Sequence, residues 1–135
     1  MQGLVLERMD HSDSAANAQT ILLVEDEMII AFDISDRLED SGFSIDGPHP
    51  SVDKALAALE KSRPDGAVLD VQLTDGTVYP VADKLKSMGV PIVFHSGHAR
   101  AEDLASRYPG ASVCTKPCPL GKLEQTLQDI LDASS

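Results

Sequence analysis

The sequence has little of what marks several classes of protein. It has no tryptophan and two cysteines in 135 residues, too few for the disulfide framework of a small secreted domain. No apolar run approaches the roughly 20 residues of a membrane span, and no basic segment followed by a long apolar one opens the chain as a secretory signal would. These absences predict a cytoplasmic protein in a reducing compartment.

Positive charge is also scarce. Lys and Arg number 11 against 22 Asp and Glu, which gives a formal net charge of −11. Nonspecific nucleic-acid binding needs clustered positive charge, and anionic membranes attract basic segments. We therefore expect neither nucleic acid nor membrane as a partner. The acidity serves solubility first, and a smaller part of it fits a cation site.

What is present fits one domain. Hydrophobic residues make up 42% of the chain, which is enough for a core and too much for a disordered protein. Residues 1–19 show no sustained periodicity, so we expect a mobile N-terminal tail, with a docking arm as the alternative. The folded domain is expected at residues 20–133.

Five short apolar runs alternate with five helical patterns. Continuous apolar runs are typical of strands buried on both faces, and we expect strands at residues 21–24, 43–45, 67–69, 92–94 and 112–114. Apolar residues recur at helical spacing within 28–38, 52–59, 78–88, 104–108 and 120–131. Residues 47–50 are expected to form a loop. This alternation predicts an α/β fold, with a parallel sheet covered by helices on both faces.

Polar side chains gather where these strands end. Glu25 and Asp26 follow the first strand, Asp70 ends the third, Ser96 follows the fourth and Lys116 follows the fifth. Any one of them could simply end a strand, but ligands of parallel α/β sheets bind at this edge. Five such residues at matching ends indicate a site.

The residue types at this edge suit phosphoryl transfer. Clustered carboxylates repel one another and favour a hard divalent cation such as Mg²⁺, so Glu25 and Asp26 are candidate metal ligands. An ionised Asp70 can attack phosphorus as the nucleophile. Ser96 and Lys116 can bind the remaining phosphoryl oxygens as charge spreads over them.

These residues stand in motifs that resemble the receiver domain of two-component response regulators. The matching pieces are Leu-Val-Glu-Asp-Glu at 23–27, Leu-Asp-Val at 69–71, Asp-Gly at 75–76, Ser-Gly at 96–97 and Lys-Pro at 116–117. The resemblance implies a flavodoxin-like, doubly wound five-stranded sheet in the order 2-1-3-4-5. It also implies an aspartyl phosphate on Asp70, formed with Mg²⁺ and a sensor histidine kinase as donor. The backbone carbonyl of Gln72 would be a further metal ligand, and the Lys116–Pro117 bond would be cis.

A narrower resemblance and several departures accompany the motifs. Residues 78–83 and 91–94 resemble the receiver subgroup associated with HWE-type kinases in alphaproteobacteria. Val113 stands where the family usually has a switching Tyr or Phe, and Cys118 replaces a common Phe. Gln72 and His98 lie where members of the family differ in phosphate lifetime, so we expect a lifetime unlike that of better-known members.

The expected function is a phosphorylation switch rather than an enzyme with a diffusible product. We expect no output domain of its own, so the signal would pass by contact with a downstream target or phosphotransfer protein, from a monomer or weak homodimer. The main alternative is a receiver-like binding module that is not phosphorylated, which Val113 favours.

Other interpretations fit the residues less well. A haloacid-dehalogenase-type hydrolase would need a second Asp where Gln72 stands, and no Gly-x-Gly-x-x-Gly follows the first strand for a dinucleotide. A metal site on Cys114 and Cys118 lacks further ligands. His95 is expected in a strand-end loop and His98 at the rim of the site, neither with a direct chemical role.

Overall fold

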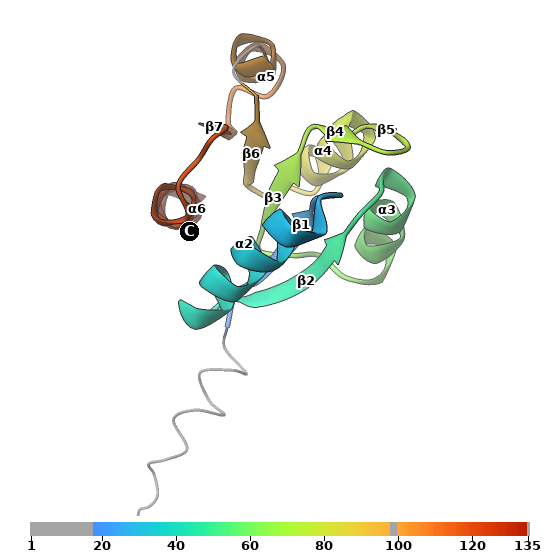
Figure 1. Cartoon of the computed structure of the whole chain (residues 1–135). Helices are drawn as coiled ribbons and strands as arrows, with labels where there is room; N and C mark the ends of the chain where they lie inside the picture. The colour runs from blue at the N-terminus through green and yellow to red at the C-terminus, as the bar shows by residue number, and fades with distance from the viewer. Residues whose placement is uncertain (1–17, 98–99, 135) are drawn as a thin grey trace, which may run out of the picture.

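The fold is a five-stranded parallel sheet between two layers of helices (Figure 1). A computed structural model describes residues 18–97 and 100–134, so most of the expected N-terminal tail and His98 lie outside the described residues. The sheet order is β2-β1-β3-β6-β7, which confirms the predicted 2-1-3-4-5 order. Its strands are β1 (Thr20–Val24), β2 (Ser44–His49), β3 (Gly66–Asp70), β6 (Ile92–Ser96) and β7 (Ser112–Thr115).

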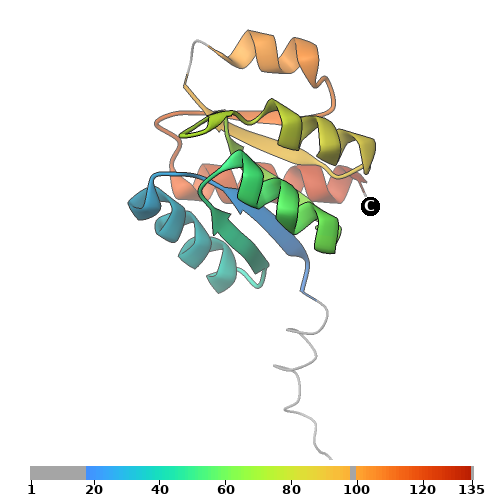
Figure 2. The same cartoon turned by 90° about the vertical axis from the view of Figure 1, so that its right-hand side faces the viewer.

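The helices divide between the two faces of the sheet (Figure 2). One face is covered by α2 (Met28–Asp40) and α6 (Leu120–Ser134). The other is covered by α3 (Val52–Lys61), α4 (Tyr79–Ser87) and α5 (Ala101–Arg107). Alternation along β1 joins both layers, because Ile21 packs on the first face and Leu22 on the second. No helix among the described residues is long and apolar enough to cross a membrane.

Local signals for helix ends agree with the structure. Ser51 caps α3, since its side chain accepts a hydrogen bond of 3.2 Å from the backbone N–H of Lys54. Gly42 and Gly89 follow α2 and α4 with φ angles of 99° and 72°, the left-handed conformation typical of helix C-termini. Tyr108, expected within the fourth helix, is instead the residue that follows α5.

The second strand is longer than predicted. Residues 47–49, expected in a loop, belong to β2. Pro48 is tolerated because β2 is an edge strand and needs no donor on its free side. A Cβ at Gly47 would lie 2.6 Å from the backbone oxygen of Leu23, so only glycine allows this close approach. The extension lets the backbone N–H of Glu25 donate to the oxygen of His49 at 3.0 Å.

A small hairpin after β3 was not predicted. It consists of β4 (Gln72–Leu73) and β5 (Gly76–Thr77), which pair antiparallel across the predicted turn. The turn is tied to α3, because the carboxylate of Asp75 accepts hydrogen bonds from the backbone N–H groups of Val52 at 2.9 Å and Asp53 at 3.3 Å. The hairpin therefore holds the segment after Asp70 in place.

The cysteines also differ from the expectation. Cys114 and Cys118 form a disulfide, whereas the cysteine count pointed to free thiols in a reducing compartment. That count excludes a framework of several disulfides but says nothing of one bond across a turn. While the sulfurs are bonded to each other, the pair offers no thiolate to a metal.

Candidate functional site

The strand register brings the predicted residues to one edge of the sheet. Asp70 of β3 lies opposite His95 of β6, and Ser96 lies opposite Thr115 of β7. Glu25 directly follows β1 and Lys116 directly follows β7. The sheet register, more than any local motif, therefore determines that these side chains meet.

Three carboxylates form a cluster at this edge. One oxygen each of Glu25, Asp26 and Asp70 lies within 4.8 Å of the others. The side chains differ in exposure: Glu25 is 1% exposed and Asp70 is 5% exposed, whereas Asp26 is half-buried. Buried carboxylates so close together repel one another unless a proton or a cation intervenes.

Lys116 pairs with Asp70. Its Nζ atom lies 3.2 Å from Oδ1 of Asp70 and donates a hydrogen bond to it. Burial and the charge of Glu25 nevertheless raise the pKa of Asp70 to about 6, with Lys116 opposing them. For Lys116 itself, burial opposes the charged form, but the charges of Asp70 and Glu25 outweigh it and raise the pKa. Without a cation, one ammonium only partly balances the cluster.

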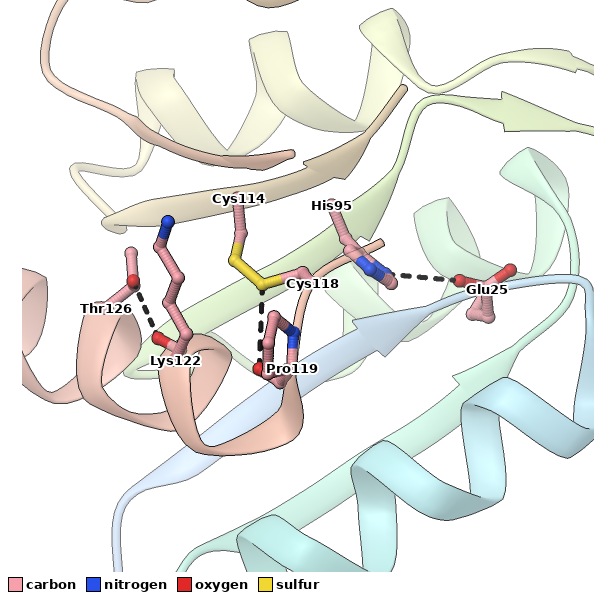
Figure 3. The surroundings of a disulfide bond; sticks show 7 residues. All are labelled: Glu25, His95, Cys114, Cys118, Pro119, Lys122 and Thr126. Carbon is pink, nitrogen blue, oxygen red and sulfur yellow. Dashed lines mark hydrogen bonds and ion pairs between the residues drawn. A yellow bond between two sulfur atoms is a disulfide. The ribbon is translucent and has the colours of Figure 1, made fainter. Parts of the chain in front are cut away.

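Glu25 and His95 leave a polar gap beside the cluster. Oε1 of Glu25 and Nδ1 of His95 are buried without a hydrogen-bond partner and lie 3.8 Å apart (Figure 3). His95 is buried within β6, not in the expected strand-end loop. Burial works against the charge of Glu25, but the neighbouring groups, led by His95 and Asp70, lower its pKa overall. A carboxylate that stays ionised while one of its oxygens accepts no hydrogen bond is suited to a hard cation.

Ser96 reaches the site through its backbone. The backbone N–H of Lys116 donates to the backbone carbonyl oxygen of Ser96 at 2.7 Å. This hydrogen bond joins the ends of β6 and β7. The Ser96 hydroxyl is buried and donates to the carbonyl of Gly97 at 3.3 Å. The space where a Cβ of Gly97 would stand is open, so a ligand can approach there.

Gln72 lies in β4, with its side chain exposed. Its Oε1 atom accepts a hydrogen bond of 3.1 Å from Nη2 of Arg100. The same guanidinium donates from Nη1 to the hydroxyl of Tyr79 at 3.5 Å, and that hydroxyl donates to Asp103 at 2.9 Å. These roles of Arg100 and Tyr79 could not be predicted from the sequence, because the contact of Gln72 with Arg100 joins residues 28 positions apart on surface segments.

Val113 is half-buried in β7 and packs against the core that α3, α4 and α5 cover. The buried residues of that core include two aromatic rings, those of Phe94 and Tyr108. Tyr108 is 5.2 Å from Phe94 between ring centroids, and its hydroxyl donates to Oδ1 of Asp83 at 2.7 Å. A buried aromatic thus exists on this side of the molecule, but at another position than Val113.

The arrangement has the parts that a phosphoryl acceptor needs. Asp70 offers a nucleophilic oxygen, the three carboxylates offer oxygen ligands, and Lys116 offers a cation at hydrogen-bond distance from the nucleophile. The structure brings the side chains of Glu25, Asp26, Asp70 and Lys116 together at this edge of the sheet. Ser96 and Gln72 lie at the same edge, with their side chains bound to other groups.

Comparison with known proteins points to the same family as the sequence motifs. The family model described as response regulator receiver domain matches residues 21–128. The phyllosphere-induced regulator PhyR of Methylorubrum extorquens is 31% identical over 107 residues, covering 77% of this chain and 40% of that protein. The chain thus spans less than half the length of this relative.

Solved structures agree in fold. A receiver protein from Sinorhizobium medicae is 31% identical with a TM-score of 0.80, covering 89% of this chain and 99% of that one. SdrG from Sphingomonas melonis is 34% identical with a TM-score of 0.71, covering 84% of this chain and 97% of that one. The structural neighbours therefore include alphaproteobacterial receivers.

Proposed function

The chain belongs to the response regulator receiver domain family, and from this we propose that it is a phosphorylation switch whose acceptor is Asp70. The donor is a sensor histidine kinase, and the output is a change in contacts with other proteins. The functional unit is the domain at residues 20–133, acting in the cytoplasm as a monomer or weak homodimer. Its own chemistry is limited to gaining and losing the phosphoryl group.

One observation carries the proposal: Lys116 Nζ lies 3.2 Å from Asp70 Oδ1 inside the three-carboxylate cluster. A buried carboxylate that served structure alone would be matched by its partners. Here the number of negative groups exceeds that of the ammonium, and the pKa of Asp70 is raised to about 6. Such an excess of acidic oxygens beside one lysine suits a cation and a phosphoryl group.

The residues present fit Mg²⁺. Glu25, whose Oε1 accepts no hydrogen bond, would hold the ion together with Asp26, Asp70 and the backbone carbonyl of Gln72. When bound, Mg²⁺ supplies positive charge that keeps Asp70 ionised at neutral pH and offsets the charge of phosphoryl oxygens. The acidic cluster is of the kind typical of receiver Mg²⁺ sites.

Asp70, Lys116 and Ser96 then have separate roles in the phosphoryl transfer. A carboxylate oxygen of Asp70 forms the new bond to phosphorus while the bond from phosphorus to the donor's histidine nitrogen breaks. Lys116 moves its ammonium from Asp70 to a phosphoryl oxygen. The Ser96 hydroxyl turns from the Gly97 carbonyl to another such oxygen. These two displacements move the ends of β6 and β7, which carries the signal outward.

The surface next to the site supports a protein donor. The first turns of α2, which follow Glu25 and Asp26, expose Met28 (36%), Ile29 (81%) and Phe32 (56%). An apolar helix face beside the acceptor suits docking of a kinase helix. We place the kinase there, of the HWE type by the narrower sequence resemblance. Ile29→Ala should then slow phosphoryl transfer from the kinase and leave transfer from acetyl phosphate unchanged.

The test uses acetyl phosphate and beryllium fluoride, each with and without Mg²⁺. Wild-type protein should form an adduct that needs Mg²⁺, and Asp70→Ala should form none. Asp36→Asn is a matched control, because it removes an exposed carboxylate of α2 outside the cluster. No adduct with wild type would favour the receiver-like binding module, and steady release of phosphate from many monoesters would favour a hydrolase.

A further inference from the structure

The cysteine pair brackets the lysine of the site. Cys114 lies on β7 and Cys118 in the loop before α6, and their sulfurs form a disulfide (Figure 3). Lys116 and Pro117 lie between them in the sequence. The two Cα atoms are 6.0 Å apart, within the usual range for disulfides. The backbone therefore already holds the two sulfurs within bonding reach.

The two cysteines differ in access. Cys114 is 1% exposed and packs in the core beneath α2 and α6. Cys118 is half-buried and lines a cavity of about 530 Å³ together with Lys116 and His95. A small molecule in this cavity would meet Cys118 first, and Cys114 would react only from within the protein.

Within the described part of the chain, two hydrogen bonds hold Lys116 in position. Its backbone N–H is bound to Ser96 at 2.7 Å and its ammonium to Asp70 at 3.2 Å, and the ammonium contact is the one that must change on phosphorylation. The disulfide adds a covalent closure of the turn that contains this lysine. Its loss would let the turn sample more conformations.

We propose that Cys114 and Cys118 form a reversible redox modification site, oxidised by low-molecular-weight disulfides of the glutathione class, that controls phosphoryl acceptance by ordering Lys116. The control of acceptance rests on the proposed function. In a reducing compartment the pair would rest as thiols and close under oxidising conditions, as transient cytosolic disulfides do.

The exchange is balanced. The Cys118 thiolate attacks one sulfur of the small disulfide and expels one small thiolate, which leaves a mixed disulfide on Cys118. The Cys114 thiolate then attacks the Cys118 sulfur and expels the second small thiolate. The protein loses two protons and two electrons, and the oxidant becomes two thiols. In the reduced state the Cys118 thiol can donate to the Pro119 carbonyl, which lies 3.7 Å from its sulfur.

Ordering of Lys116 should favour the reaction at Asp70. With the turn closed, the ammonium is already placed beside the acceptor and loses less freedom when the phosphoryl group arrives. We expect the oxidised form to accept phosphoryl groups from acetyl phosphate roughly threefold faster than the reduced form. Cys118→Ser should behave like the reduced wild type and ignore the oxidant.

The disulfide is tested by mass, independently of phosphorylation. Trypsin should release residues 108–122 as one peptide, because Lys116 precedes proline. After treatment of the full chain with oxidised glutathione, this peptide should be lighter by two hydrogen atoms and resist alkylation, and dithiothreitol should reverse both changes. Thiols that stay open to alkylation, or cross-links between chains, would overturn the proposal.

Acceptance of phosphoryl groups is then measured on the same oxidised and reduced samples. A faster oxidised form, with Cys118→Ser insensitive to oxidant and Cys114→Ala stopped at the mixed disulfide on Cys118 without a gain in rate, supports the coupling. Equal rates in samples whose peptide is fully oxidised or reduced would overturn it. If neither form accepts a phosphoryl group while the peptide still changes mass reversibly, the proposed function fails, and the redox control fails with it.

Discussion

Asp70→Asn should stabilise the metal-free protein at neutral pH. The native site buries Asp70 next to Glu25, and these two factors raise its pKa from 3.8 to about 6. Folding therefore favours the protonated carboxyl. This contribution to stability is complete below the unfolded pKa and is lost as the pH rises through the folded one. Asparagine carries no charge and avoids the loss.

The size of the effect follows from the shift. About two pKa units correspond to an upper limit of about 3 kcal/mol at pH 7. Lys116 loses its partner in the variant and reduces the gain, so we expect about 1 to 3 kcal/mol. For a domain of this size that is roughly 4 to 10 °C in melting temperature.

The assay is thermal unfolding of wild type and Asp70→Asn in chelator at pH 7 and pH 4, repeated at pH 7 with Mg²⁺. The difference in melting temperature between Asp70→Asn and wild type should be largest at pH 7 in chelator. It should become smaller toward pH 4, and smaller at pH 7 when Mg²⁺ is added. Asp75→Asn gives the opposite sign, because hydrogen bonds from Val52 and Asp53 lower the pKa of Asp75. Asp75→Asn should be less stable than wild type at pH 7, and this difference in stability should become smaller as the pH falls. A less stable Asp70→Asn at pH 7, or a difference in melting temperature that does not change with pH, would show that the pKa of Asp70 is not raised in the folded protein.

Three further predictions concern single residues. Lys116→Ala should lower the rate of phosphoryl acceptance on the order of 100-fold while binding of Mg²⁺ persists, as measured by single-turnover labelling. Tyr108→Phe should cost about 1 kcal/mol in urea unfolding, because it leaves Asp83 without its 2.7 Å partner. Gly47→Ala should destabilise by about 1–3 kcal/mol, since φ is 128° and backbone atoms crowd the new Cβ, whereas Gly97→Ala should be tolerated.

Much of the fold could be predicted because each strand carries its own local signal. The run Ile21 to Val24 is apolar on both faces, and polar residues end it abruptly. The order of strands followed from a family resemblance and the general handedness of crossovers. The cis Lys116–Pro117 bond, implied by the same resemblance, is present.

The features that could not be predicted from the sequence depend on tertiary contacts. Pro48 looks like a loop residue, and only the free edge of β2 makes it acceptable in a strand. The hairpin of β4 and β5 has two residues per strand, too short for periodicity. The burial of His95 depends on β6 being a central strand. The contact of Gln72 with Arg100 joins distant surface segments.

The acceptor itself can be located directly. After reaction with acetyl phosphate and Mg²⁺, an acyl phosphate can be trapped by borohydride, which converts the modified aspartate to homoserine. The expected tryptic peptide, residues 62–84, holds Asp65, Asp70, Asp75 and Asp83, so fragmentation compares four candidates within one molecule. We expect homoserine at position 70 alone, dependent on Mg²⁺. Label at another of these aspartates, or none, would contradict it.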